Sequence, residues 1–330
     1  MDANIIVTIG EEAIKSNPEM VIEKMIDYDV TYFRFNLSRY QSINDFEDHV
    51  NIIKRIRKCF ENKIQIIIDL PYPNEKIRVF IPNALYRDIN QGEHIIIESN
   101  NSSTHIEGAL KCNVNDLDEL IEEDGQSVLY GDGEITFICE SRNHVNKSVE
   151  LIAEQEGKIF SRKAISFGKI VPSMIDINEV IKKVLIIKPD AVAFSFVSSS
   201  EEIESATRLL EENGVKIFSK IENENGAKRI NEISKISDII VARGDLLMNT
   251  KLNEFGFVQS KILENAKENH KTTAVATGIL TSLAKQNIPT QAELVDLYDM
   301  KKANVDYVIL NYGLVRSHNI EKAIKLIKAI

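Results

Sequence analysis

Residues Val215–Leu246 read VKIFSKIE at one end and IIVARGDL at the other, and they indicate the fold of the whole chain. Two short runs rich in β-branched residues flank a polar segment of helical length, which is typical of a strand–helix–strand unit in a parallel sheet. Side chains alternate along a strand, so Lys220 and Glu222 project to the same side. Asp245 closes the second run. If both runs are parallel strands, two carboxylates and an ammonium converge at one edge of the sheet.

This convergence has two interpretations, and the pattern alone does not choose between them. Two carboxylates with room for substrate oxygens suit a divalent cation such as Mg²⁺ or Mn²⁺. A nearby lysine would then stabilise negative charge on whatever the metal holds. The alternative is a salt bridge at two strand ends, which needs the same residues and no ligand.

Similar apolar runs recur along the chain, and charged segments of helical length such as Glu201–Glu212 separate most of them. Continuous apolar runs are typical of strands buried on both faces of a parallel sheet. Eight strands alternating with amphipathic helices predict an α/β fold of the (β/α)8 TIM-barrel class. The eight runs are Ile5–Gly10, Tyr32–Leu37, Ile64–Leu70, Ala191–Val197, Ile217–Glu222, Ile239–Asp245, Thr273–Leu280 and Tyr307–Leu310.

One interval breaks this alternation. Between the third and fourth runs, residues 75–169 contain short alternating runs separated by turn residues, including Asp132-Gly133 before Glu134–Glu140. An Asp-Gly pair between alternating runs is typical of a β-hairpin. We therefore expect a small antiparallel β domain at 75–169, inserted after strand 3 between barrel parts at 1–74 and 170–330. Without the insertion about 235 residues remain, close to the roughly 250 of a typical barrel.

Composition narrows the class of protein. The net charge of −10 argues against a nucleic-acid-binding surface. The three cysteines lack metal-binding spacing, which favours reduced thiols in the cytosol. The first residues do not resemble a secretory signal, and no apolar run approaches the roughly 18 residues that span a membrane. We expect a cytoplasmic protein that acts on small molecules, with no nucleic-acid or membrane partner.

Polar residues gather at the predicted carboxyl ends of the strands, where barrels of this class carry their active sites. A metal between carboxylates, a fixed lysine and a strand-end arginine suit phosphoryl transfer, which needs positioning and charge neutralisation. Taken singly, these residues have plainer interpretations as rim ion pairs, loop caps or β-forming residues. Besides the first three residues, the set contains Arg34, Asn36, Ser38, Asp69, Arg243, Gly244 and Thr277.

Several motifs in this order resemble the pyruvate kinase family over nearly the whole chain. They are IIVTIG at 5–10, RFNLS at 34–38, SKIENENG at 219–226, VARGDL at 241–246 and NIPTQAE at 287–293. The expected insertion lies where that family has a mobile lid, and GKIFSRKAISF at 157–167 is similar to the segment that returns from the lid.

The resemblance implies phosphoryl transfer between phosphoenolpyruvate and ADP with Mg²⁺ or Mn²⁺. Glu222 and Asp245 would hold the metal, and Lys220 would stabilise the phosphoryl group in transfer. Backbone N–H groups of Gly244 and Asp245 would bind the substrate carboxylate, and Arg34 would contact phosphate.

The same resemblance assigns roles to further residues. Thr277 would lie beside the enolate face where pyruvate is protonated, and Asn36, Ser38 and Asp69 match the family's monovalent-cation ligands. Lys76 stands where an ammonium could replace K⁺, so a K⁺ requirement stays open. Arg78 could bind nucleotide phosphate or only occupy the lid hinge.

Some positions depart from the family pattern. The last motif, Leu310–Val315 (LNYGLV), lacks the hydroxyl and carboxylate linked to the proton relay. The turn after strand 3 lacks its lysine, and Ser198, Gly278 and Gln291 replace usual residues. The chain ends after the eighth strand and its helix, so we expect no carboxy-terminal effector domain and, if the protein assembles, a homodimer through the barrel.

These departures spare the metal ligands, the lysine and the first phosphate contact, and they leave three functions open. The first is a phosphotransferase of the pyruvate kinase type. The second is an enzyme that uses the same metal and 2-oxo-acid site for other chemistry, such as C–C cleavage or biosynthetic phosphoryl transfer. The third is a non-catalytic paralogue that binds a metabolite or a partner protein.

Overall fold

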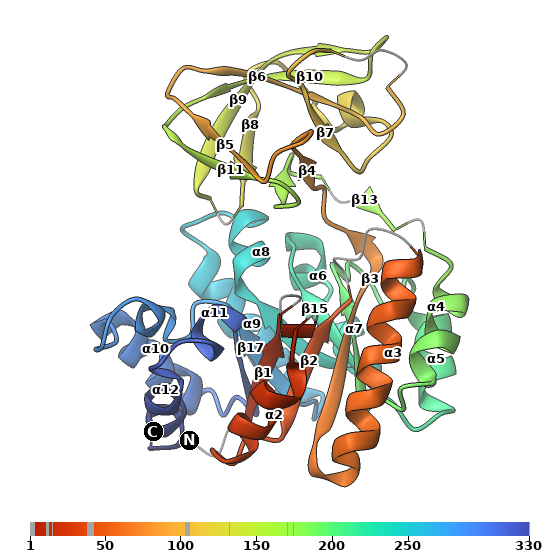
Figure 1. Ribbon diagram of the computed structural model, residues 1–330, viewed down its shortest axis with the longest axis vertical. Helices are drawn as coiled ribbons and strands as arrows, with labels where there is room; N and C mark the ends of the chain where they lie inside the picture. Colours follow the sequence, from red (N-terminus) through yellow and green to blue (C-terminus); the bar gives the residue numbers. More distant parts are fainter. Residues whose placement is uncertain are drawn as a thin grey trace. The chain divides into compact units, whose positions relative to one another are not determined.

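The chain forms two units in the computed structural model (Figure 1). The structure describes every residue except 1–3, 11, 12, 15, 38–42, 103–105, 132, 170, 174 and 330. One unit consists of Met1–Pro73 and Ser173–Ile330, and the other of Asn74–Pro172.

The first unit is a closed barrel of eight parallel strands, each hydrogen-bonded to its two neighbours, which confirms the predicted TIM-barrel fold. Strand β18 pairs with β1, and β2 pairs with β3, so the sheet closes on itself. In order around the barrel the strands are β1 (Asn4–Ile9), β2 (Tyr32–Asn36), β3 (Gln65–Glu75), β14 (Ala191–Ser195), β15 (Lys216–Ile221), β16 (Asp238–Ala242), β17 (Thr273–Ala276) and β18 (Tyr307–Leu310).

Two hydrophobic clusters occupy the two faces of this barrel. The smaller one contains strand residues only, such as Ile67, Phe218 and Ile240, and fills the barrel interior. The residues that alternate with them, such as Ile66 and Ile68, belong to the larger cluster that the strands share with the helices. This explains why the strands read as continuous apolar runs in the sequence.

The helices follow the strands, and their ends carry the expected capping residues. Asp176 accepts hydrogen bonds from two backbone N–H groups at the start of α4, and Thr290 with Glu293 forms a capping box on α10. The helices are α2 (Pro18–Ile26), α3 (Ile43–Phe60), α4 (Ile177–Leu185), α5 (Glu204–Glu211), α6 (Glu224–Lys228), α7 (Ile230–Ile236), α8 (Arg243–Met248), α9 (Phe255–Glu268), α10 (Gln291–Lys302), α11 (Tyr312–Val315) and α12 (Ile320–Ala329).

The second unit is a β domain with its own core, as the alternating runs predict. Its larger sheet has the order β12-β8-β9-β10-β6-β7-β4, antiparallel except for the β6–β7 pair, and β11 pairs with β5. The strands are β4 (Val79–Phe80), β5 (Tyr86–Ile89), β6 (His94–Glu98), β7 (Leu110–Cys112), β8 (Ser127–Tyr130), β9 (Ile135–Asn143), β10 (Ser148–Ala153), β11 (Gly157–Phe160), β12 (Ile165–Ser166) and β13 (Val171–Pro172). The predicted hairpin joins β8 and β9, where Gly131 and Gly133 have φ values of 66° and 89°.

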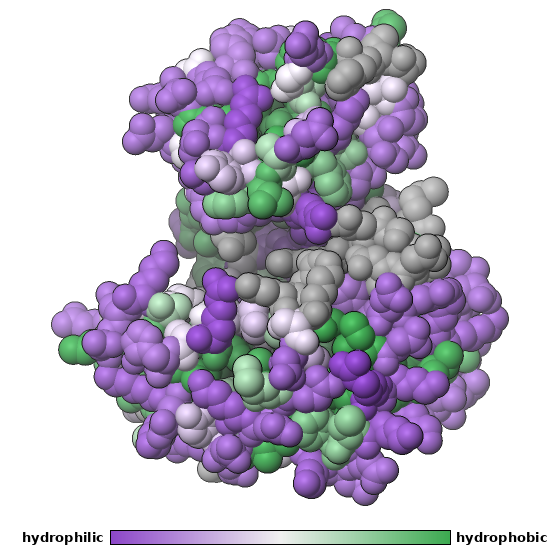
Figure 2. Space-filling view, in the orientation of Figure 1, coloured by the Kyte–Doolittle hydropathy of each residue, from purple (hydrophilic) through white to green (hydrophobic). Residues whose placement is uncertain are grey.

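The visible face of each unit is mainly hydrophilic, with scattered hydrophobic residues (Figure 2). Among the described residues, no helix is both long enough and apolar enough to cross a membrane. All three cysteines carry free thiols, and Cys112 and Cys139 are buried.

Candidate active site

Every second side chain of each strand faces the barrel interior, and at the carboxyl ends of several strands these inward positions are polar. Asp69 and Lys220 each follow an interior residue, Ile67 and Phe218, by two positions. They therefore point to the same side of the sheet as the interior cluster, but one layer closer to the strand ends. Ser195 at the end of β14 follows the interior residue Ala193 in the same way.

Lys220 is fixed by three oxygen atoms. Its Nζ lies 3.2 Å from Oε1 of Glu222 and 3.3 Å from Oδ1 of Asp69. It also donates a hydrogen bond to Ser195 Oγ at 3.0 Å. Lys220 is only 7% exposed and Glu222 only 1%, so the ammonium is held in one place with little access of water.

Asp69 connects this lysine to the second strand. Its Oδ2 accepts a hydrogen bond from Nε of Arg34 at 3.0 Å and also contacts the Nη2 of that guanidinium. Ser195 Oγ donates to Oδ1 at 3.3 Å. Arg34 in turn donates through Nη1 to Thr8 Oγ1 at 3.2 Å. The carboxylate of Asp69 is thus completely buried and contacts two cations at once.

The two opposite charges keep each other ionised. Burial disfavours the charged form of both groups, but the charges of Asp69 and Glu222 outweigh it and raise the pKa of Lys220. At Asp69, burial by itself would raise the pKa of the carboxyl group, but the charges of Lys220 and Arg34 have the larger effect and lower it. Lys220 is therefore an ammonium at neutral pH, suited to neutralising negative charge rather than to accepting a proton.

Glu222 and Asp245 lie at the ends of neighbouring strands, as the sequence predicts. Glu222 directly follows β15, and Asp245 lies in the first turn of α8, directly after β16. The side-chain amide of Asn249 donates to the backbone oxygens of both residues, at 3.2 Å and 2.8 Å. The charge of Asp245 also contributes to the raised pKa of Lys220. The two carboxylates thus act on one ammonium.

This donor set fits a hard divalent cation. Glu222 Oε2 accepts a hydrogen bond at 2.7 Å from the backbone N–H of Phe196, whose φ of 52° lies in the left-handed region. Each carboxylate oxygen has two lone pairs, so Glu222 can keep this bond and still ligate a metal. Two carboxylates with substrate oxygens and water complete the coordination that Mg²⁺ or Mn²⁺ prefers.

Thr277 lies on a strained turn after β17. It is exposed and has a φ of 74°, which is unusual for a β-branched residue. Arg243 Nε donates to its carbonyl oxygen at 2.8 Å, and Arg243 Nη1 contacts both oxygens of Asp296 at 2.7 and 2.8 Å. Gly278 allows the guanidinium to come close, because a Cβ there would lie 3.3 Å from Nη2. Asp296 on α10 thus anchors Arg243, which holds the turn at Thr277.

The end of strand β18 is filled by an aromatic ring. Asn311 caps the short helix α11 by accepting a hydrogen bond from Leu314 N at 2.9 Å. The ring of Tyr312 lies against Gly10 after β1, where an added Cβ would be 2.4 Å from ring atom Cδ1. The side chain of Asn311 is therefore occupied in helix capping, and Tyr312 covers the start of the loop after β1.

The remaining predicted residues lie in different parts of the chain. Asn36 ends β2 and stands opposite Asp69 in the parallel register. Gly244 lies between Arg243 and Asp245 at the start of α8. Lys76 and Arg78 belong to the second unit, where Asn113 hydrogen-bonds to the backbone of both. Ser38 lies outside the described residues.

Three residues of the site were missed by sequence reasoning. Ser195 had a signal, because it is the polar residue at an interior position of an apolar strand. Asn249 stands four residues after Asp245, a spacing that brings side chains to one face of a helix. Asp296 lies 53 residues from Arg243 in sequence, and no local pattern connects the two.

Comparison with known proteins places these residues in a family context. The family model for the barrel domain of pyruvate kinase matches residues 1–312. Pyruvate kinase of Thermotoga maritima is 29% identical over 99% of this chain and 69% of its own length. Pyruvate kinases of Aeropyrum pernix and Thermoplasma acidophilum are 26% and 28% identical over 93% and 94% of this chain. The chain spans 65% and 54% of the lengths of those two relatives.

Proposed function

This chain belongs to the pyruvate kinase family, and from that premise we propose that its barrel catalyses metal-dependent phosphoryl transfer between phosphoenolpyruvate and ADP, or a close variant of these substrates. The observation that supports this most directly is the buried ammonium of Lys220, held between Asp69 and Glu222 with Asp245 acting on it. A fixed ammonium, together with a divalent metal held by two carboxylates, would supply the positive charge that a phosphoryl group in transfer requires.

The proposal gives each of these residues a stated role. Glu222 and Asp245 would hold Mg²⁺ or Mn²⁺, which would neutralise charge on the substrate oxygens. The Lys220 ammonium would stabilise the phosphoryl oxygens while the bond from phosphorus to the enolpyruvate oxygen breaks and a bond to the ADP oxygen forms. Arg34 would contact the phosphate, and the N–H groups of Gly244 and Asp245 would bind the substrate carboxylate. The enolate would then take up a proton at carbon, on the face beside Thr277.

We also propose that turnover does not require K⁺. Asp69 matches a monovalent-cation ligand of the family, but its carboxylate already contacts the charged groups of Arg34 and Lys220. Two internal cations lower the affinity of that carboxylate for a third. Asn36 and Ser38 would be the other ligands of such a site, and Lys76 would supply a substitute ammonium. Arg78 is proposed, on the resemblance alone, as a contact to nucleotide phosphate.

A second candidate is a different reaction at the same metal and 2-oxo-acid site. The observation that favours it is the altered end of β18. There Asn311, Gly313 and Leu314 carry neither the hydroxyl nor the carboxylate of the family's proton relay, and Asn311 caps α11 instead.

Assembly and location are further proposals. Helices α9 and α10 carry exposed apolar side chains, with Phe257 71% and Val295 60% exposed. We propose that this surface supports a homodimer through the barrel, which light scattering would detect. Free thiols at Cys59, Cys112 and Cys139 favour a cytoplasmic location.

An assay of pyruvate formation tests the function directly. With phosphoenolpyruvate, ADP and Mg²⁺ or Mn²⁺ we expect turnover in the presence and absence of K⁺. Lys220→Met should lower it by about three orders of magnitude or more, as loss of an electrostatic stabiliser does. Lys182→Met, which removes an exposed lysine of α4, is the matched control and should leave turnover unchanged.

The negative outcomes separate the candidates. If pyruvate does not form but Mn²⁺ with oxalate raises the melting temperature, the second candidate gains support, because oxalate resembles a 2-oxo-acid enolate. If neither ligand shifts the transition, only a non-catalytic role survives. Wild-type turnover in Lys220→Met would contradict the role given to that lysine.

A further inference from the structure

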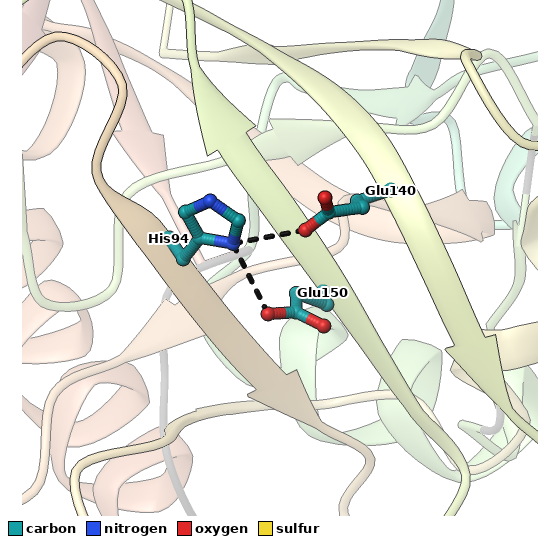
Figure 3. Close-up of side chains that lie close together, drawn as sticks. All are labelled: His94, Glu140 and Glu150. Carbon is teal, nitrogen blue, oxygen red and sulfur yellow. Dashed lines mark hydrogen bonds and ion pairs between the residues drawn. The ribbon is translucent and has the colours of Figure 1, made fainter.

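The second unit carries a group of potential metal ligands that the proposed reaction does not use. His94 on β6, Glu150 on β10 and Glu140 on β9 come from three neighbouring strands of the larger sheet (Figure 3). Nδ1 of His94 lies 2.9 Å from Oε2 of Glu140 and 3.2 Å from Oε1 of Glu150. Within the part of the chain that the structure describes, this is the one group of three such residues whose ligand atoms converge.

A β-bulge builds this group. In the β9–β10 pairing Glu150 stands opposite Ser141, whereas Leu151 stands opposite Cys139, so Glu140 is the extra residue. A bulge lets consecutive residues leave the strict alternation of the strand and re-aims a side chain. Cys139 points into the core, but Glu140 and Ser141 are both exposed. The bulge therefore turns the Glu140 carboxylate towards His94 and Glu150, as Figure 3 shows.

The neighbouring strand supplies an orienting contact. Ser141 Oγ donates a hydrogen bond to Oε2 of Glu150 at 3.2 Å, while Oε1 of the same carboxylate faces His94. Such a second contact on a carboxylate fixes which oxygen is offered to a metal. His94 lies opposite Ile152 and Glu150 opposite Ile96, so the β6–β10 register holds both ligands in place.

We propose that His94, Glu140 and Glu150 form a surface zinc site with one coordination position open to solvent. Zinc accepts imidazole and carboxylate ligands at about 2.0–2.2 Å, which puts neighbouring ligand atoms of a tetrahedron roughly 3.4 Å apart. The present separations of 2.9 and 3.2 Å are shorter than that value by about 0.5 and 0.2 Å, so the side chains would need only a small outward shift to admit the ion. The imidazole favours Zn²⁺ over Mg²⁺ and Ca²⁺, which prefer oxygen ligands only.

Zinc at this position would link β6, β10 and β9, which are the central strands of the sheet. The bound ion would replace the contacts of His94 Nδ1 with Glu140 and Glu150 by coordinate bonds, and it would lower the freedom of all three side chains. Because the unfolded chain does not preserve this arrangement, zinc should raise the melting temperature of the second unit. Its open position would take water or one donor atom from a ligand.

Calorimetric titration of the full chain with Zn²⁺, in excess Mg²⁺ to saturate oxygen-only sites, tests the proposal. The wild type should bind one equivalent more than His94→Ala, and Glu140→Gln should weaken that equivalent roughly tenfold or more. His144→Ala is the matched control. It removes an exposed histidine of the same unit that contacts a single carboxylate, Asp118, and should bind as the wild type does.

Co²⁺ gives a second readout that does not depend on enzyme activity. The wild type should show the visible absorption of cobalt with nitrogen and oxygen ligands, and His94→Ala should lose it. Circular dichroism of each variant verifies that the sheet is folded. If His94→Ala is unstable, the isosteric Glu140→Gln still tests whether the site binds the metal. Equal zinc stoichiometry and affinity in the wild type and both ligand variants would overturn the proposal and leave His94 as a residue that only contacts two glutamates.

Discussion

Replacing Asp69 by asparagine tests whether the charge cluster at the strand ends stabilises the barrel. The substitution keeps the size of the side chain, so it creates no cavity. It removes the negative charge that lies 3.3 Å from Lys220 Nζ and that also contacts the Arg34 guanidinium. Both cations would remain in a site where Lys220 is 7% exposed. Loss of the charge, rather than loss of packing, should therefore determine the result.

The expected loss follows from the burial of the pair. Removing one partner of a buried ion pair costs about 3–5 kcal/mol. Glu222 still lies 3.2 Å from Lys220 in the variant, which limits the loss to the lower end, about 3 kcal/mol. For a unit of this size that corresponds to a fall of about 6–12 °C in melting temperature. The exposed pair of Glu204 and Arg208 provides the control, and Glu204→Gln should not change stability measurably.

Denaturant unfolding followed by far-ultraviolet circular dichroism measures this loss. The α-helices of the described residues all belong to the barrel unit, so the helical signal reports on the barrel. Folding lowers the pKa of Asp69 below its ordinary value of 3.8. The stability that the ionised carboxylate adds is therefore fully present above pH 3.8, and it is lost as the pH falls through the lower pKa of the folded state. The difference between wild type and Asp69→Asn should thus be constant near neutrality and shrink below about pH 4. Equal midpoints at pH 7 with equal denaturant dependence would refute the reasoning.

Two further substitutions probe the walls of the site. Gly10→Ala should lower the free energy of unfolding by about 1–3 kcal/mol, because its methyl group would lie 2.4 Å from the Tyr312 ring. In a Tyr312→Ala background the same change should cost little, and additive effects would contradict the contact. Asp296→Asn should lower the free energy of unfolding by about 1.5–3 kcal/mol, because it weakens two hydrogen bonds to the Arg243 guanidinium. It should also lower turnover, because Arg243 holds the turn at Thr277 through a hydrogen bond to the carbonyl oxygen of that residue. Chemical denaturation measures both losses of stability, and steady-state kinetics measures the turnover of Asp296→Asn. Unchanged turnover in that variant would show that Arg243 does not position the turn.

The fold and the centre of the site could be predicted because both depend on one local rule. Side chains alternate along a strand, and parallel strands end at one edge, so Asp69, Lys220 and Glu222 could be brought together from their spacing alone. The inserted β domain was equally visible, because its alternating runs and Asp-Gly turn differ from the continuous runs of the barrel. These signals need no knowledge of distant contacts.

Other features depend on contacts that sequence spacing does not encode. The partner of Arg243 is a helix residue 53 positions away, and the bulge that exposes Glu140 depends on how β9 pairs with β10. Tyr312 could be recognised as a departure from a motif, but its packing against Gly10 could not. Likewise, Asp69 matched a cation ligand, and only the structure gives it two cationic partners within the protein.

The charges of the cluster explain why a metal and an anionic substrate would bind together. Arg34 and Lys220 contribute two positive charges, and Asp69, Glu222 and Asp245 contribute three negative charges, so the cluster alone carries one net negative charge. It would repel a substrate with a carboxylate and a phosphate. A divalent cation on Glu222 and Asp245, as proposed above, would reverse that sign while Asp69 keeps its contacts with Arg34 and Lys220. We therefore expect oxalate to raise the melting temperature only when Mn²⁺ is present. A shift with oxalate alone would mean that Arg34 and Lys220, without the metal, already provide enough positive charge.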